Sequence, residues 1–287
     1  MRIEVLILTR GGTLRPAAET LASVERQTVR ASVRVVESSR LGTLEPSGAS
    51  LVAVMQDGDE WRSRDKLARQ ASWLASHPEA AGCFHAFTRP GPLANGTARA
   101  GGSARAGDSD RAAVRPPDRA ELYDAEDLWT ERTFLSVSTL LFRADRLGGY
   151  PEWLGSRVVT PGFALSALLL DGGGLLGYLD VAMAHCPGRT PSASREALER
   201  RFVNTRLGFR YEAWLARFLA SRDLARARAS LENGRRPAAR GHFLSALRRD
   251  PAEACLRSGW LPLRLAVPVP TAPIRRRKPV PKWRGIS

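Results

Sequence analysis

The stretch Val54-Met55-Gln56-Asp57-Gly58-Asp59-Glu60-Trp61 decides how this sequence is interpreted. It grows out of the apolar run Leu51–Met55, which predicts a buried β-strand because it is short, apolar and contains branched residues. An Asp-Gly-Asp turn directly after such a strand places two carboxylates at the strand's carboxyl end. Open α/β sheets bind their ligands at that end. The stretch therefore predicts a ligand site on a sheet edge.

The segments around this stretch alternate between strand and helix patterns. Short apolar runs predict strands at residues 2–9, 32–36, 51–55, 81–88, 137–142 and 177–183. Apolar residues at helical spacing predict helices at 14–28, 64–76, 124–131 and 163–170. Such alternation indicates an α/β fold, in which a mostly parallel sheet is flanked by helices.

The chain is expected to have three parts. Residues 1–193 form the α/β domain, 194–267 a C-terminal helical extension, and 268–287 a basic, proline-rich tail that is expected to be disordered. Within the first part, residues 90–118 are rich in Gly, Ala, Ser, Pro and Arg, which predicts a flexible loop. The extension is predicted to contain one helix from 194 to about 233 and, after Gly234, another over 237–247.

The charge of the chain favours anionic partners. The formal net charge is +15, with 44 basic and 29 acidic residues, which suits nucleotides, acidic glycans, anionic lipid headgroups or nucleic acid. Richness in Ala and Arg also fits a GC-rich coding genome, and that alternative stays open. No nucleic-acid-binding motif is present, so nucleic acid is not the expected partner. The Lys and Arg residues of the tail leave peripheral binding to an anionic membrane as an alternative.

The cysteines and the apolar runs indicate a cytoplasmic protein. The three cysteines form no C-x-x-C pair, which argues against a disulfide framework and a structural zinc site. No signal peptide is recognisable, and no apolar run approaches the roughly 20 residues that cross a bilayer. The expected location is the cytoplasm, with peripheral attachment to the inner face of the membrane as the open alternative.

Three segments, in the same order, resemble family 2 glycosyltransferases, which have the GT-A fold. The first is Val5–Thr9 followed by Leu21-x-Ser23-Val24-x-x-Gln27-Thr28. The second is Val54–Trp61, continuing through Asp65-Lys66-Leu67-x-x-Gln70 to His77-Pro78-Glu79-Ala80, and the third is Ser138–Arg143 followed by Gly148-Gly149-Tyr150. A weaker match, from Ala238-Ala239-Arg240 to Asp250-Pro251, is similar to helical tails of bacterial members. The resemblance implies a GT-A-like nucleotide-diphospho-sugar transferase fold.

The resemblance also implies a nucleotide-binding set. Thr9 and Arg10 end the first strand, where the family contacts the nucleoside. Glu37 stands where the family usually has an Asp that binds the base, and a Glu can accept the same hydrogen bond. An alternative for Glu37 is a solvated acid at a strand end. Asp57 is expected beside the diphosphate.

A divalent cation, Mn²⁺ or Mg²⁺, is the cofactor that the resemblance implies. It would be held by Asp59, with Asp57 and His185 as further ligands, and would neutralise the diphosphate leaving group. Asp59 is the stronger candidate, because the family usually has acids where Gln56 and Gly58 stand. The alternative is a surface Asp-Gly turn without a metal.

The expected catalytic base is missing from the sequence. An inverting transfer needs a carboxylate to take the proton of the acceptor hydroxyl. The family has that acid at the start of the helix beginning near residue 163, where this chain has Thr160-Pro161-Gly162. Glu152 and Asp171 are the nearest acids in the sequence, and neither matches the motif.

Two functions follow from these observations. The first is an inverting glycosyltransferase that moves a sugar from a UDP- or dTDP-activated donor to a glycan, a lipid-linked acceptor or a secondary metabolite. The second is a catalytically degenerate protein of the same fold that serves as a binding or partner subunit. The absence of an acid at residues 160–162 motivates the second.

Overall fold

The computed structural model describes residues 1–10, 14–45, 47–89, 113–116, 120–130, 135–156, 158–187, 193–259, 261 and 265. Its contacts divide the chain into two units, Met1–Leu128 with Arg132–Arg206, and Trp129–Glu131 with Leu207–Ser287. The helix α5 (Ala193–Arg206) thus belongs to the first unit, although the sequence analysis placed the boundary after residue 193. The predicted loop at 90–118 lies almost wholly outside the described residues. The predicted tail at 268–287 lies entirely outside them.

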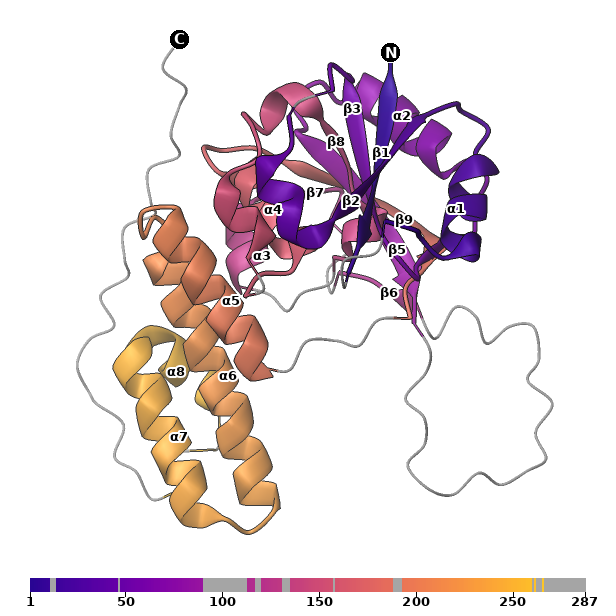
Figure 1. Cartoon of the computed structure of the whole chain (residues 1–287). Coiled ribbons are helices and arrows are strands. Elements are labelled where there is room, and N and C mark those ends of the chain that lie inside the picture. The colour runs from indigo at the N-terminus through magenta and orange to yellow at the C-terminus, as the bar shows by residue number, and fades with distance from the viewer. Residues whose placement is uncertain are drawn as a thin grey trace, which may run out of the picture. The chain divides into compact units, whose positions relative to one another are not determined.

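The first unit is built on one twisted sheet (Figure 1). Its strands are β1 (Ile3–Thr9), β2 (Ser32–Glu37), β3 (Leu51–Gln56), β4 (Glu60–Trp61), β5 (Gly82–Thr88), β8 (Leu141–Arg143) and β9 (Leu176–His185), in the order β2-β1-β3-β8-β5-β9-β4. Two short strands, β6 (Ala113–Val114) and β7 (Leu122–Tyr123), pair with β5 and β9. The three longest pairings, β1 with β2, β1 with β3 and β5 with β9, are parallel. The predicted α/β fold with a mostly parallel sheet is confirmed.

Helices pack on the sheet because its strands carry apolar residues along their whole length. All seven residues of β1 are buried. On one face, Val5 and Ile7 of β1 pack in a buried cluster with Val24 of α1 (Ala18–Glu25) and Leu67 of α2 (Lys66–Ser76). The other first-unit helices are α3 (Ala125–Thr130), of which residues up to Leu128 lie in this unit, α4 (Pro161–Leu170) and α5. Nine of the ten residues of α4 are buried, so this helix is apolar on all sides.

Two predicted elements are interrupted in the structure. The strand predicted at 137–142 is a 3₁₀ helix, η3 (Val137–Thr139), followed by β8. The helix predicted from 194 to about 233 is α5 followed by α6 (Glu212–Glu232). Gly208 lies between them with φ +68°, a backbone conformation that ends a helix.

The second unit is a helical hairpin closed by a short third helix. Its helices are α6, α7 (Arg236–Arg249) and α8 (Pro251–Ser258), and their buried side chains, among them Leu224, Phe243 and Ala254, form one cluster. Asp223 accepts hydrogen bonds from Ser245 Oγ (2.7 Å) and Arg249 Nε (2.9 Å), which ties α6 to α7. Across the described ranges no helix is long and apolar enough to cross a membrane.

Gly177 of β9 lies against Trp73 of α2, and this contact yields a testable prediction. A Cβ atom at position 177 would be 1.9 Å from Cη2 of Trp73, so Gly177→Ala must displace the indole ring. We expect a loss of about 1–3 kcal/mol in the free energy of unfolding, the usual cost of overpacking. The control is Gly241→Ala in α7, where no atom lies within 4 Å of the added Cβ. It should stabilise by about 0.5–1 kcal/mol, and denaturant unfolding of both variants measures the difference.

Candidate functional site

Three adjacent strands of the first unit end side by side at the carboxyl edge of the sheet. Thr9, the last residue of β1, pairs with Glu37, the last residue of β2. Leu8 pairs with Gln56, the residue directly before Asp57. The structure therefore brings together the ends of the strands that carry Thr9, Glu37 and Asp57, as the sequence pattern predicted.

The Asp-Gly-Asp segment is a tight turn at this edge. The backbone N–H of Asp59 donates to the carbonyl of Gln56 (3.0 Å), and the N–H of Asp57 donates to the carbonyl of Leu8 (2.9 Å). Gly58 has φ +89°, a conformation that residues with a side chain rarely adopt. The glycine is thus required by the turn itself, and the turn fixes where the two flanking carboxylates begin.

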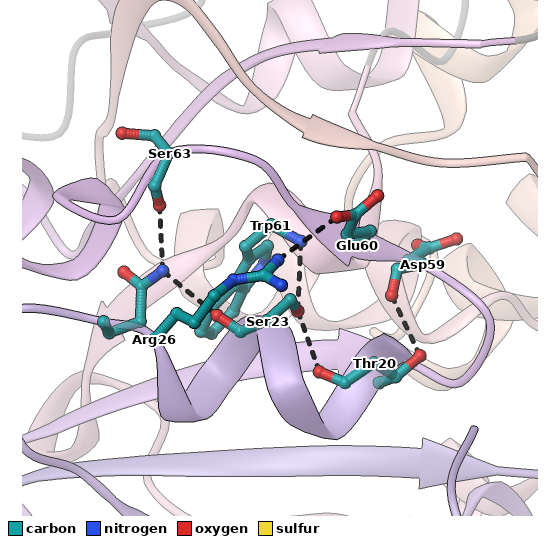
Figure 2. Close-up of polar contacts among 8 residues, drawn as sticks. Thr20, Ser23, Arg26, Asp59, Glu60, Trp61 and Ser63 are labelled. Atoms are coloured by element: carbon teal, nitrogen blue, oxygen red, sulfur yellow. Dashed lines mark hydrogen bonds and ion pairs between the residues drawn. The ribbon is translucent and has the colours of Figure 1, made fainter. Parts of the chain in front are cut away.

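Side chains of α1 hold this turn from below, as Figure 2 shows. Thr20 Oγ1 donates to the carbonyl of Asp59 (2.9 Å) and accepts from the N–H of Gly58 (3.0 Å). One turn later, Ser23 Oγ accepts from the N–H of Trp61 (3.2 Å). These bonds satisfy backbone groups of Gly58, Asp59 and Trp61. The spacing Thr20–Ser23 on the helix therefore positions the acidic turn.

Asp59 is directed into the protein. Its carboxylate is 6% exposed, and Oδ2 accepts a hydrogen bond of 2.5 Å from Ser138 Oγ of η3. Burial raises the pKa of Asp59, although the bonds from Ser138 and Cys186 and the positive charges of Arg89 and Arg10 oppose the shift. Two arginines thus bring positive charge to the same edge as the acidic turn.

Asp57 accepts a hydrogen bond from the backbone directly before α1. Its Oδ1 accepts from the backbone N–H of Ala17 at 2.7 Å, directly before the helix begins. Because Asp57 and Asp59 bond to different parts of the unit, their carboxylates do not form a joint pair. Among the described residues, no group of three His, Cys, Asp or Glu side chains could hold a metal ion. The described residues alone therefore form no complete metal centre.

His185 ends β9 and pairs with Glu60, the neighbour of Asp59. Its Nδ1 lies 3.0 Å from Thr88 Oγ1. Burial lowers the pKa of His185, and the charge of Arg62 lowers it further, against the opposing effect of Glu60.

The predicted nucleoside contacts differ in how accessible they are. Thr9 is buried, and its hydroxyl donates to the carbonyl of Val36 (3.4 Å). Ser38 Oγ donates to the carbonyl of Thr9 (2.9 Å), which closes the end of β1. Glu37 is half-buried and Arg10 is exposed. Glu37 and Arg10 are therefore the side chains available to a ligand here, whereas the Thr9 side chain belongs to the core.

Glu199, an acid distant in the sequence, lies beside residue 160. Thr160 precedes α4, and both its backbone N–H and its hydroxyl donate to Oε1 of Glu199 in α5. Glu199 is 2% exposed, and burial raises its pKa against the hydrogen bonds from Thr160 and the charges of Arg200 and Arg195. No local sequence signal distinguishes Glu199, because it is separated from Thr160 by 39 residues and lies in an ordinary helical pattern.

The two acids predicted from proximity in sequence lie elsewhere. Asp171 follows the last residue of α4, about 15 Å along a ten-residue helix from the end at Thr160. The chain then enters β9 at Leu176, which pairs with Gly82 at the start of β5, so Asp171 lies toward the opposite edge of the sheet. Glu152 begins the short 3₁₀ helix η5 (Glu152–Gly155) and is exposed. Within the described residues, neither acid forms a hydrogen bond with Thr160.

Comparison with known proteins bears on the fold alone. No family model matches the sequence, and no curated protein matches it. Among solved structures, the chain is similar to that of S. aureus TarS, with a TM-score of 0.50 and 12% sequence identity. The match covers 92% of this chain and 52% of the other, so this chain spans about half the length of TarS. TarS is a GT-A-like glycosyltransferase, and the fold of the present chain is GT-A-like.

Proposed function

We propose that this chain is a glycosyltransferase that binds a nucleoside diphosphate sugar at the carboxyl edge of β1, β2 and β3. The observation that carries the proposal is the meeting of Glu37, Arg10 and the Asp57–Asp59 turn at the ends of adjacent parallel strands. Glu37 offers a hydrogen-bond acceptor to the N–H of a pyrimidine base. Arg10 and Arg89, whose charges act on Asp59, offer positive charge to the diphosphate.

The donor is proposed to be a UDP- or dTDP-sugar, and its acceptor a hydroxyl compound. In an inverting transfer, the acceptor oxygen attacks the anomeric carbon as the bond to the diphosphate breaks, and the bonding pair leaves with the diphosphate. Positive charge beside the leaving group stabilises that transition state. We assign this role to Arg10 and Arg89, whose charges act on Asp59.

The proposal includes a divalent cation, held by fewer protein ligands than the sequence pattern predicted. Asp59 and His185 would be its protein ligands, and diphosphate oxygens would complete the coordination, because the described residues supply no third ligand. When bound, the cation would neutralise the leaving diphosphate. UDP affinity measured by calorimetry in EDTA and in Mn²⁺ tests this, and equal affinities would remove the cation from the proposal.

The test of the proposed function is a thermal-unfolding titration with UDP and dTDP. A nucleotide at about 100 times its dissociation constant should add about 2.7 kcal/mol to the stability of the wild type. Arg10→Ala should weaken binding about tenfold, which corresponds to about 1.4 kcal/mol. The matched control is Arg146→Ala, an exposed arginine beyond β8, which should bind like the wild type. No response to either nucleotide would overturn the proposal.

A binding protein without catalysis is the second candidate, favoured by the lack of an acid at residues 160–162. Hydrolysis of UDP-glucose and UDP-N-acetylglucosamine separates the two, because water can replace the natural acceptor in a transferase. Nucleotide binding without release of free sugar, even with added acceptors, would support the binding protein.

A further inference from the structure

We propose that the hairpin end of the second unit binds the anionic headgroups of a membrane surface. The hairpin end is defined by residues 228–240, around the turn from α6 to α7, together with Leu256 and Arg257 of α8. The inference goes beyond the proposed function, because it concerns the second unit and uses no residue of the strand-end site. Its basis is where the exposed arginines of this unit gather and how its acids are used.

The second unit carries an uneven charge. Residues 207–259 contain eleven arginines, no lysine and five acidic residues. Asp223 bonds to α7, as described above, and Asp250 caps α8 by accepting from the N–H of Glu253 (3.0 Å). Glu253 in turn pairs with Arg257 (2.6 Å). Because three of the five acids are engaged inside the unit, an excess of positive charge faces solvent, and this charge favours an anionic partner.

The register of the hairpin sets the level at which its arginines lie. Asp223, ten residues before the turn at 233–235, bonds to Ser245, ten residues after it. Arg228 and Arg240 are five residues before and five residues after the same turn, so they lie level with each other on α6 and α7, which run side by side in Figure 1. Both are exposed, and both therefore belong to the hairpin end.

The C-terminal end of α8 reaches the same level. The guanidinium of Arg228 donates to the backbone carbonyl of Arg257, which fixes the last turn of α8 beside α6. Leu256, the neighbour of Arg257, is 75% exposed. An apolar side chain among arginines is typical of membrane-surface sites, because the guanidinium groups meet lipid phosphates while the apolar group enters the boundary of the acyl chains.

Three arginines of the hairpin end form no polar contact that would hold the fold together. The side chains of Arg235, Arg236 and Arg240 are exposed, and among the described residues they form no hydrogen bond or ion pair. Arg235 is the N-cap of α7 and Arg236 its first residue, and the first turn contains no acid. Glu232, at the end of α6, is the nearest acid in the sequence and is exposed as well. Since the helix dipole disfavours positive charge at this end, the two arginines lower the stability of the free protein, and an anionic surface would remove that cost.

A lipid surface fits the hairpin end better than other anionic partners do. Surfaces that bind single-stranded nucleic acid combine basic residues with aromatic side chains that stack on the bases. Among the described residues of the hairpin end, no aromatic side chain is exposed. An acidic polysaccharide would use the arginines but would leave Leu256 in water. Only a membrane uses both kinds of side chain.

The test is cosedimentation of the full chain with vesicles of phosphatidylcholine alone and with vesicles that also contain phosphatidylglycerol. The wild type should bind the anionic vesicles and not the neutral ones. A variant with Arg235→Gln, Arg236→Gln and Arg240→Gln should bind about 100-fold more weakly, because each basic residue near an anionic surface contributes roughly a factor of five. Arg240→Gln alone should lose about fivefold. Urea unfolding of both variants should stay near wild type, since the three side chains form no polar contact among the described residues.

Two controls separate the hairpin end from net charge and from other polyanions. The first removes the same number of charges from the first unit, by Arg30→Gln, Arg64→Gln and Arg69→Gln, which are exposed arginines without a side-chain hydrogen bond or ion pair among the described residues. This variant should bind anionic vesicles like the wild type. The second is Leu256→Asn, which should weaken vesicle binding about tenfold through the lost apolar contact and leave binding to soluble heparin unchanged.

Three outcomes would overturn the proposal. A triple variant of the hairpin end that binds anionic vesicles like the wild type would place the membrane contact elsewhere in the chain. Equal losses in the two triple variants would show that only the net charge matters. A wild type that binds heparin but no vesicle would make the partner an acidic polymer. None of these results bears on the strand-end site, which the nucleotide titration tests separately.

Discussion

Replacing Lys66 with methionine is expected to stabilise the folded protein by on the order of 3 kcal/mol at pH 7. Lys66 begins α2 and is completely buried, and among the described residues its Nζ forms no hydrogen bond. Its Nζ lies over the Trp61 ring, 3.9 Å from the centroid. Burial lowers the pKa of Lys66 to about 7. Folding at neutral pH therefore takes a proton from a group that would otherwise hold it.

The size of the effect follows from the two protonation states. An unfolded lysine has a pKa near 10.5, so a folded pKa of about 7 costs on the order of 4 kcal/mol at pH 7. Loss of the contact with Trp61 subtracts about 1 kcal/mol from the gain. Methionine fills nearly the same volume without a charge, so it should leave no large cavity.

The pH dependence has a defined sign and window. Between pH 7 and pH 10.5 the unfolded chain holds a proton that folded Lys66 lacks, so the contribution of Lys66 makes wild-type stability rise with pH in that range. The groups facing Lys66 are Cys83, His85 and Cys186. Burial lowers the pKa of His85 to about 3 and raises those of both thiols, Cys83 to about 12. The two thiols begin to lose protons in the unfolded chain as the pH approaches their ordinary value of 9.0, which opposes the effect of Lys66, so Lys66 dominates only near pH 7.5 to 8.

Urea unfolding of the wild type and Lys66→Met at pH 7, 7.5 and 8 measures this effect. The wild type should gain stability across the series and the variant should not. Arg69→Met is the control, because Arg69 is exposed on the same helix. A Lys66→Met protein less stable than the wild type at pH 7 would show that Lys66 is charged in the fold and stabilised there by a partner.

Much of the fold was predictable because its strands are local patterns. The runs 3–9, 32–37, 51–56 and 82–88 are apolar, bounded by turn residues, and differ from the predicted ranges by a residue or two. By contrast, the pattern at 137–142 predicted a strand, and Val137–Thr139 forms a 3₁₀ helix instead.

The reason lies in contacts made over long distances in the sequence. Ser138 Oγ accepts from the N–H of Gln56 (2.9 Å), the carbonyl of Ser138 accepts from Trp61 Nε1 (2.8 Å), and the carbonyl of Thr139 accepts from Gln70 (2.9 Å). These partners lie about 70 or more residues away and replace the bonds of a sheet ladder, which no window of neighbouring residues reveals.

The candidate site, like the fold, has parts that could be predicted from the sequence and parts that could not. The strand-end residues Glu37, Asp57 and Asp59 could be placed from sequence, because parallel strands share a carboxyl edge. Glu199 could not, because its position depends on how α5 packs on α4. The environment of Asp59 was also hidden, since its hydrogen-bond partners Ser138, in η3, and Cys186, directly after β9, are distant in the sequence.

Trp61→Ala is expected to be the most damaging substitution near the site, with a loss of about 3–5 kcal/mol in the free energy of unfolding. Trp61 follows the acidic turn and is 1% exposed. Removing the indole leaves a cavity beneath Lys66 and frees the carbonyl of Ser138 from its donor. Both effects fall on the segment that holds Asp59.

A second variant separates packing from hydrogen bonding. Trp61→Phe keeps most of the ring and removes Nε1, so it should lose about 1–3 kcal/mol, the cost of an unpaired buried carbonyl at Ser138. Trp153→Phe is the control, since that ring is half-buried and contacts Phe202 edge to face (6.4 Å between centroids). Because Ser138 also bonds Asp59, Trp61→Phe should weaken the UDP response as well as stability. Unchanged UDP affinity in Trp61→Phe would show that the position of Asp59 is independent of the indole.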